Sequence, residues 1–131
     1  MKIFILFTLI FIFNLPSYAK SLFNSKYYEL SFNSNNIDSD KLYKIDEIKN
    51  LNLDNILRKI LINEDYLSIK KNLDENFVNL FIKNIIIEDE KIYNNNYYSK
   101  VKINFDKNKI IKYLKKNKLS YVENIPNKFL I

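Results

Sequence analysis

The chain contains no cysteine, histidine, glycine or tryptophan, and Arg58 is its single arginine among 131 residues. Without cysteine it has no disulfide, no thiol chemistry and no lipid-attachment residue. Without histidine and cysteine it lacks the commonest general base and the usual zinc ligands. The absence of glycine excludes the phosphate-binding loop and the dinucleotide fingerprint, because both need backbone close to phosphate. The composition therefore predicts a protein that is not an enzyme and holds no cofactor or metal.

The missing residues also follow a codon pattern. Gly, Ala and Arg, whose codons are rich in G and C, are rare or absent, whereas Asn, Ile and Lys are abundant. This bias is typical of an AT-rich bacterial genome. It explains many of the asparagines, because Asn tolerates a left-handed backbone better than other residues with a side chain.

Residues 1–19 have the pattern of a secretory signal peptide. Lys2 supplies the positive charge, an apolar run of eleven residues follows it, and Ser17 and Ala19 are the small residues that a signal peptidase requires. We expect cleavage after Ala19 and export to the periplasm. The remaining residues 20–131 are expected to form a single domain. If the segment stayed uncut it would be a poor anchor, because a spanning helix needs roughly 20 apolar residues.

The formal net charge is +6, and the lysines that produce it are spread along the chain. Nucleic-acid binding would favour clustered lysines, stacking aromatics and arginine forks. We therefore predict no nucleic-acid partner. A solvated surface and a weak attraction to anionic lipid remain as alternatives.

The first half of the mature chain mixes strand and helix patterns. Tyr27–Phe32 is expected to be a strand, residues 33–40 a polar loop, and residues 42–50 either a short strand or irregular. A helix with Asn52 as its N-cap should follow, because apolar residues then recur with helical spacing. Its inward face would consist of Leu53, Ile56, Leu57, Ile60 and Leu61. Helical runs over residues 63–71 and from Asp74 are predicted next, as two helices or one bent helix.

The second half begins with a change to a period of two, which predicts a hairpin of residues 84–93 and 97–105. Charge and face matching favour a three-residue turn at residues 94–96 with Tyr93 opposite Tyr97. That register would also pair Ile87 with Ile103, Ile85 with Phe105, Glu88 with Lys102 and Glu90 with Lys100. Asp106 should cap a final helix over residues 107–116 that ends at Asn117, and residues 129–131 should form a short terminal strand. The fold class expected is α+β, a small, mainly antiparallel sheet with helices on one face, in the order β-α-α-β-β-α-β.

The residue patterns offer few candidates for chemistry. The spacing Ser-x-x-Lys occurs at Ser68 and recurs at Ser17 and Ser99, which is the frequency that chance gives in a lysine-rich chain. Asp38 and Asp40 resemble the start of a calcium loop, yet no glycine follows at its sixth position. We therefore expect no catalytic, cofactor-binding or metal-binding residue. The candidate interaction surface combines exposed tyrosines and the lysines of the last helix: Tyr27, Tyr28, Tyr98, Lys107, Lys112, Lys115 and Lys116.

The order of strand, Phe105-Asp106, amphipathic helix, Leu119, then Pro126 before a short apolar end resembles an uncharacterised family of secreted bacterial proteins known as domain of unknown function 2066. The resemblance covers roughly residues 51–131. It departs from the family pattern at Ile125, where an arginine is usual, and in lacking the family's Gly and Trp. The resemblance implies a location in the cell envelope and offers no catalytic residue, and members often continue beyond the terminal strand.

Together these patterns predict an exported envelope protein that acts as a non-catalytic periplasmic binding or assembly module. Its expected partner is another envelope protein or a second copy of the chain. The alternative is a membrane-surface protein held by an uncleaved signal segment and the lysine-rich last helix.

Overall fold

The structure is a computed structural model that describes residues 22–122. The predicted signal peptide with its cleavage site, Pro126 and the predicted terminal strand lie outside these residues. The elements are β1 (Tyr28–Asn33), α2 (Ile37–Ile60), α3 (Asn63–Lys70), α4 (Glu75–Asn79), β2 (Ile82–Tyr93), β3 (Asn96–Phe105) and α5 (Lys107–Lys116). This arrangement confirms the predicted α+β class.

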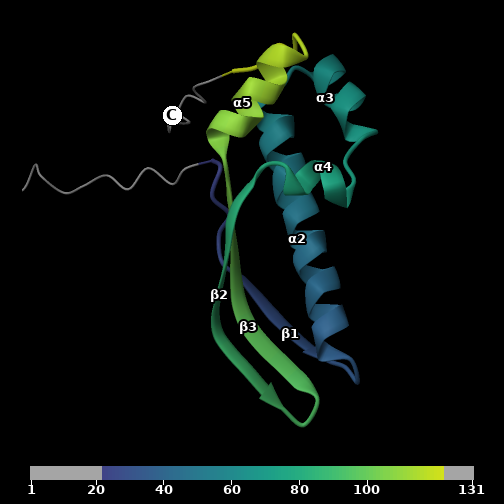
Figure 1. The fold of residues 1–131 in the computed structure, drawn as a ribbon, viewed down its shortest axis with the longest axis vertical. Coiled ribbons are helices and arrows are strands. Elements are labelled where there is room, and N and C mark those ends of the chain that lie inside the picture. Colours follow the sequence, from purple (N-terminus) through teal and green to yellow (C-terminus); the bar gives the residue numbers. More distant parts are fainter. Residues whose placement is uncertain (1–21, 123–131) are drawn as a thin grey trace, which may run out of the picture.

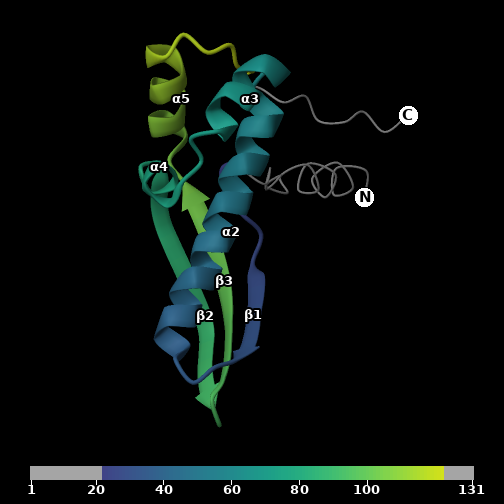
Figure 2. The ribbon, with the colours of Figure 1, turned by 90° about the vertical axis from the view of Figure 1, so that its right-hand side faces the viewer.

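The three strands form one antiparallel sheet in the order β1-β3-β2, so β3 is central and β1 and β2 are its edges. Helix α2 runs along one face of the sheet, and α3, α4 and α5 gather at the end away from the β2–β3 turn (Figures 1 and 2). No helix of the described part covers the opposite face (Figure 1). The prediction that helices pack on one face is confirmed. We call the uncovered side the outer face.

Helix α2 is longer than predicted and corrects two expectations. Residues 33–40 are not one polar loop and residues 42–50 are not strand, because α2 begins at Ile37 and runs through Asn52, the predicted cap. The N-cap is Asn36, whose side chain accepts a hydrogen bond from the backbone N–H of Ser39. Asp38 stands in the first turn, where the helix dipole favours negative charge. Asp38, Ser39 and Asp40 of the predicted loop are exposed in the first turn of the helix.

The inward side of α2 explains why the helix extends so far. Ile45 and Ile48 are buried in the first half, as are the apolar residues predicted for the second half. Burial of an amphipathic face is the main source of helix stability in proteins. The contact of this face with the sheet therefore outweighs the weak helix propensity of the Asn and Asp residues around it.

The hairpin register also differs from the prediction. The turn has two residues, Asn94 and Asn95, with φ angles of 46° and 63°, and Tyr93 lies opposite Asn96. Two left-handed residues are what a type I′ turn requires, and Asn supplies both where Gly is absent. The predicted pairing of Tyr93 with Tyr97 is therefore wrong.

A bulge explains how the shorter turn still places the correct side chains inward. Between Glu88 and Lys91 the strand contains one residue more than its partner, and Asp89 there has a φ of 55°. This extra residue shifts the register again. Three pairs differ from the prediction as a result: Ile87 faces Val101, Ile85 faces Ile103, and Glu88 in place of Glu90 faces Lys100. A second register shift, between Ile82 and Asn84, sets Ile82 opposite Phe105.

The other predicted elements that fall within residues 22–122 are present. The residue runs after position 62 form two separate helices, and Asp74 caps α4 by accepting from the backbone N–H of Phe77 at 2.8 Å. Asp106 caps α5 and Asn117 ends it. Alternation along β3 buries Tyr97, Ser99, Val101, Ile103 and Phe105 as expected. None of the helices between residues 22 and 122 has both the length and the apolar character needed to cross a bilayer.

Candidate functional site

Tyrosines are adjacent in the sequence at positions 27–28 and at positions 97–98, and in each case one ring lies inward and the other outward, as alternation along a strand requires. Tyr27 and Tyr98 are 41% and 47% exposed, and Tyr98 lies on the outer face. Tyr97 is fully buried and Tyr28 is half-buried. Tyr28 lies on the helix side of the sheet, opposite Val101, whereas Tyr98 lies on the outer face. The tyrosines predicted to interact therefore do not form one continuous surface.

Opposite charges pair across the outer face. The hydroxyl of Tyr27 donates to Oε1 of Glu88 at 2.7 Å, and Nζ of Lys102 lies 5.4 Å from the centre of the Tyr27 ring. Nζ of Lys100 lies 2.8 Å from Oδ2 of Asp89. The hydrogen bond to Glu88 raises the pKa of Tyr27, and the one from Lys100 lowers the pKa of Asp89. Lys100 and Asp89 on this face thus neutralise each other, whereas Glu88 and Lys102 both contact the neutral side chain of Tyr27.

Tyr28 belongs to a hollow between α2 and the segment that precedes β1. Its hydroxyl donates to Oδ1 of Asn52 at 3.1 Å, and Nζ of Lys26 lies 5.4 Å from the centre of its ring. The hollow has a volume of about 330 Å³, and Asn55 and Lys59 of α2 also line it. Its lining offers amides and two ammonium groups but no carboxylate.

The lysines of α5 form an exposed basic surface. Lys107, Lys112, Lys115 and Lys116 are all exposed, as predicted for an interaction surface, and so are Lys109 and Lys118. None of the ion pairs among residues 22–122 involves these six side chains. We call them the α5 lysine face. Its charge is not neutralised by ion pairs within the described part of the chain, in contrast to that of Lys100 on the outer face.

The free edge of β2 is a surface that the sequence did not single out. Within the described residues β2 pairs with β3 on one side only, so its other side presents unpaired backbone groups. Ile85 and Ile87 are each 38% exposed, and Ile86 between them is half-buried. The run of three isoleucines was visible in the sequence, but its position on an edge depends on the strand order.

A partly buried polar cluster joins the first half of α2 to the hairpin. The hydroxyl of Tyr97 donates to Oε1 of Glu90 at 2.7 Å, and Nζ of Lys41 reaches the same oxygen at 3.2 Å. Burial raises the pKa of Tyr97, whereas the hydrogen bonds from Tyr97 and Lys41 lower the pKa of Glu90. The phenol therefore stays protonated as a donor and the carboxylate stays ionised, which suits a structural role.

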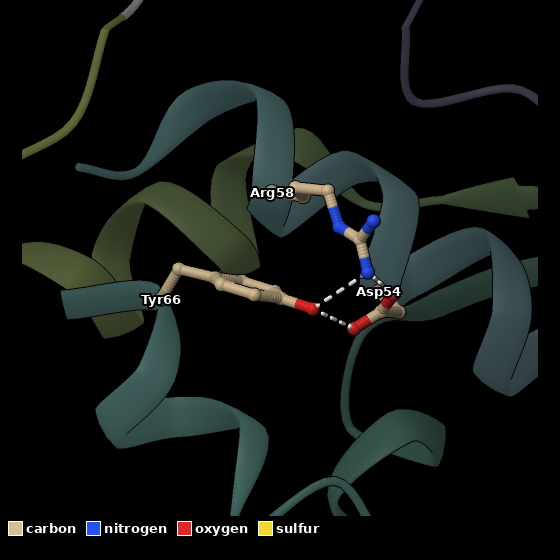
Figure 3. A network of polar contacts seen from close by, with 3 residues as sticks. All are labelled: Asp54, Arg58 and Tyr66. Carbon is tan, nitrogen blue, oxygen red and sulfur yellow. Dashed lines mark hydrogen bonds and ion pairs between the residues drawn. The ribbon is translucent and has the colours of Figure 1, made fainter. Parts of the chain in front are cut away.

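A second polar network ties α3 to α2 and uses the single arginine (Figure 3). The hydroxyl of Tyr66 donates to Oδ1 of Asp54 at 2.7 Å. A guanidinium nitrogen of Arg58 donates to the Tyr66 hydroxyl at 3.1 Å and to Oδ2 of Asp54 at 3.2 Å. The spacing of Asp54 and Arg58 by four residues signals an ion pair on one helix face, but nothing in the sequence indicated Tyr66 as the third member.

The Ser-x-x-Lys spacing at Ser68 and the pair Asp38 and Asp40 both take part in local helix structure. The Ser68 hydroxyl donates to the backbone carbonyl of Asp65 at 2.7 Å, so its proton is directed at the backbone and not at Lys71. Asp38 and Asp40 stand in the first turn of α2. Among residues 22–122 no group of three or more carboxylate, imidazole or thiol side chains is placed to hold a metal ion.

Comparison of the chain with protein-family models, with curated proteins and with solved structures finds no match. The resemblance to domain of unknown function 2066 therefore stays a prediction.

Proposed function

We propose that this chain is an exported, non-catalytic binding module of the bacterial envelope that binds a partner strand along the free edge of β2. The observation that supports binding is the edge itself, where Ile85, Ile86 and Ile87 follow one another beside unpaired backbone groups. Soluble proteins usually protect such an edge with charges, a proline or a bulge, because an open apolar edge pairs with other chains. In β2 the two register shifts lie on either side of the three isoleucines and leave that segment regular. Export is supported by the pattern of residues 1–19.

Strand addition suits this surface for two physical reasons. An added strand satisfies backbone groups that face water in the isolated chain, and it brings side chains against the half-exposed isoleucines. The charged residues of β2, Lys83 and the run from Glu88 to Lys91, flank this apolar centre and leave it free. A partner strand of apolar residues fits between them.

The proposal is tested by a photoreactive amino acid placed at position 87 of the full chain in living cells. We expect a defined adduct in the envelope fraction, because the side chain at that position lies beside the added strand. The matched control is position 51, since Leu51 is 52% exposed on α2. Equal adducts at both positions, or none at position 87, would contradict strand addition. Mass spectrometry of the same material should find Lys20 as the first residue, and an intact N-terminus would contradict cleavage.

The α5 lysine face favours a second function, attachment to an anionic membrane surface. Six exposed lysines within twelve residues, without ion pairs in the described part, produce a local positive potential that anionic headgroups attract. Each lysine near such a surface contributes about 1 kcal/mol, so the attraction is additive and sensitive to salt.

Vesicle binding tests this second function. The full chain should bind phosphatidylglycerol vesicles at low salt and dissociate at high salt, and replacement of Lys112, Lys115 and Lys116 by Glu should abolish binding. The control replaces Lys70 and Lys71, which lie on α3 and at its end, in the same way. Binding that resists salt, or that the control variant loses equally, would argue against a role for α5.

A further inference from the structure

We propose that the strand added to the edge of β2 is β2 of a second copy of this chain, paired antiparallel about a two-fold axis at Ile86. This inference rests on the proposed function and names its partner. Three observations support it: the symmetric positions of the two register shifts in β2, the distribution of its side chains between the two faces of the sheet, and the positions of its charged residues.

The irregularities of β2 are placed symmetrically about Ile86. One register shift lies between Ile82 and Asn84 and the other between Glu88 and Lys91. The regular segment between them runs from Asn84 to Glu88, with Ile86 at its centre. An antiparallel copy centred there places regular backbone against regular backbone along the whole segment.

The faces of the sheet match in this register. Ile85 and Ile87 pair with Ile103 and Val101 of β3, which are buried beneath the helices, so they lie on the helix side. Residues 84, 86 and 88 lie on the outer face. Centring the two-fold axis on Ile86 sets Ile85 opposite Ile87 of the copy, and residues of one face always meet residues of the same face. A shift by one residue would set helix-side positions against outer-face positions.

The charges also complement each other in this register. By residue count Lys83 lies opposite Asp89 of the copy, whose carboxylate Lys100 of its own chain also contacts at 2.8 Å, and the two-fold axis repeats this contact at the other end. Lys83 forms none of the ion pairs found among residues 22–122, so it is available for such a contact. An axis at Ile87 would instead set Lys83 against Lys91, and like charges directly opposite destabilise a sheet.

The other edge of the sheet lacks these features. Strand β1 has six residues, and the centre of its sequence, Glu29 to Phe32, has no apolar run. The regular segment of β2 is the apolar, self-complementary edge of the described sheet. The resulting dimer would have one continuous six-stranded sheet with both helical layers on the same side.

Single-cysteine variants test the register directly, because the natural chain has no cysteine. Residues opposite each other on antiparallel strands have Cα atoms about 4.5 to 5.5 Å apart, within the range that a disulfide bridges. Mild oxidation of the full chain carrying Ile86→Cys should therefore give a covalent dimer. Lys83→Cys alone should not, whereas Lys83→Cys combined with Asp89→Cys should. The matched control, Ser31→Cys, places a thiol at an exposed position of the other edge strand and should stay monomeric.

Sedimentation of the cysteine-free chain provides the second measurement. We expect a reversible dimer, and Ile86→Lys should raise its dissociation constant about tenfold or more, because two ammonium groups would meet at the axis. Ser31→Lys should leave the constant unchanged, and circular dichroism should show that both variants are folded. A monomer at all concentrations without a disulfide at position 86, or equal disulfides at positions 31 and 86, would overturn the dimer.

The two proposals fail in different ways. A photoadduct at position 87 with a different protein, without a disulfide in the Ile86→Cys variant, would overturn self-pairing and leave strand addition in place. The absence of any adduct and any disulfide would overturn both.

Discussion

The hydroxyl of Tyr97 donates a hydrogen bond of 2.7 Å to Oε1 of Glu90 from a ring that is itself fully buried. The ring stacks on Phe32 with a centroid separation of 5.0 Å, and Lys41 of α2 reaches the same carboxylate. One phenol thus links both edge strands and the long helix at the hairpin end of the molecule. This end lies away from α3, α4 and α5 (Figure 1).

Replacement of Tyr97 by Phe should lower the free energy of unfolding by about 1 to 2 kcal/mol, because the ring keeps its packing and only the hydrogen bond to a charged acceptor is lost. Urea unfolding of the purified chain measures the change. Tyr93→Phe is the control, since Tyr93 is 73% exposed and its replacement should change stability by less than about 0.5 kcal/mol. Equal effects of the two substitutions would refute a role for this bond.

Stability should fall at acid pH partly through Glu90. The hydrogen bond from Tyr97 and that from Lys41 lower the folded pKa of Glu90 below its ordinary value of 4.5. A carboxylate with a depressed folded pKa contributes its stability above the unfolded value and loses it as the pH falls through the folded one. The difference in unfolding free energy between the natural chain and Glu90→Gln should be present at pH 7 and diminish below pH 4.5. A difference that does not change with pH would contradict this origin.

Tyr66→Phe should destabilise the chain by about 1 kcal/mol, because it removes the donor to Asp54 and leaves the buried ring in place. Arg58→Lys should cost less than Tyr66→Phe, since the side chain of Arg58 is 59% exposed and solvent screens its contacts. Amide hydrogen exchange in α3 reports whether the loss is local to the contact with α2. A larger effect for Arg58→Lys would show that the arginine, and not the phenol, holds α3 in place.

Asn95→Gly should stabilise the hairpin by about 0.5 kcal/mol, because Asn95 has a φ of 63° and Gly adopts this region without a steric cost. Thermal unfolding measures the gain. The control, Asn108→Gly, lies inside α5 and should lose up to about 1 kcal/mol, since Gly is a poor helix residue. A loss of stability at position 95 would indicate that the Asn95 side chain contributes more than its backbone conformation costs.

Several elements could be predicted because their signals are local. The cap at Asp106, the end of α5 at Asn117 and the alternation from Tyr97 to Phe105 depend on neighbouring residues along the chain, and all three are confirmed. The start of α2 could not be predicted, because its Asn, Ser and Asp residues favour loops as much as helix caps. Burial of Ile45 and Ile48 against other elements decides that residues 37–51 continue the helix.

The register of the hairpin also could not be predicted from local signals. The exchange of a three-residue turn for a two-residue turn with a bulge leaves most inward side chains inward, so the hydrophobic pattern alone does not distinguish them. Glu90 is the residue that reveals the difference, because the bulge turns it toward Lys41 and Tyr97. The candidate site was predictable only in part. Exposure of Tyr98 and the α5 lysines followed from periodicity, whereas the choice between Tyr27 and Tyr28 and the free edge of β2 required the structure.

The sequence by itself determined the α+β class, the inward faces of β3 and of the second half of α2, and the absence of the thiol, imidazole and glycine residues that several kinds of chemistry need. Composition and short-range periodicity are properties of the chain before it folds, and they do not depend on which strands become neighbours. Only the tertiary structure decided that β3 is central, that β2 carries its isoleucines on an edge, and that Tyr97, Glu90 and Lys41 meet. These outcomes depend on contacts between residues far apart in the chain, where burial of apolar surface favours one pairing over others that local propensity allows equally.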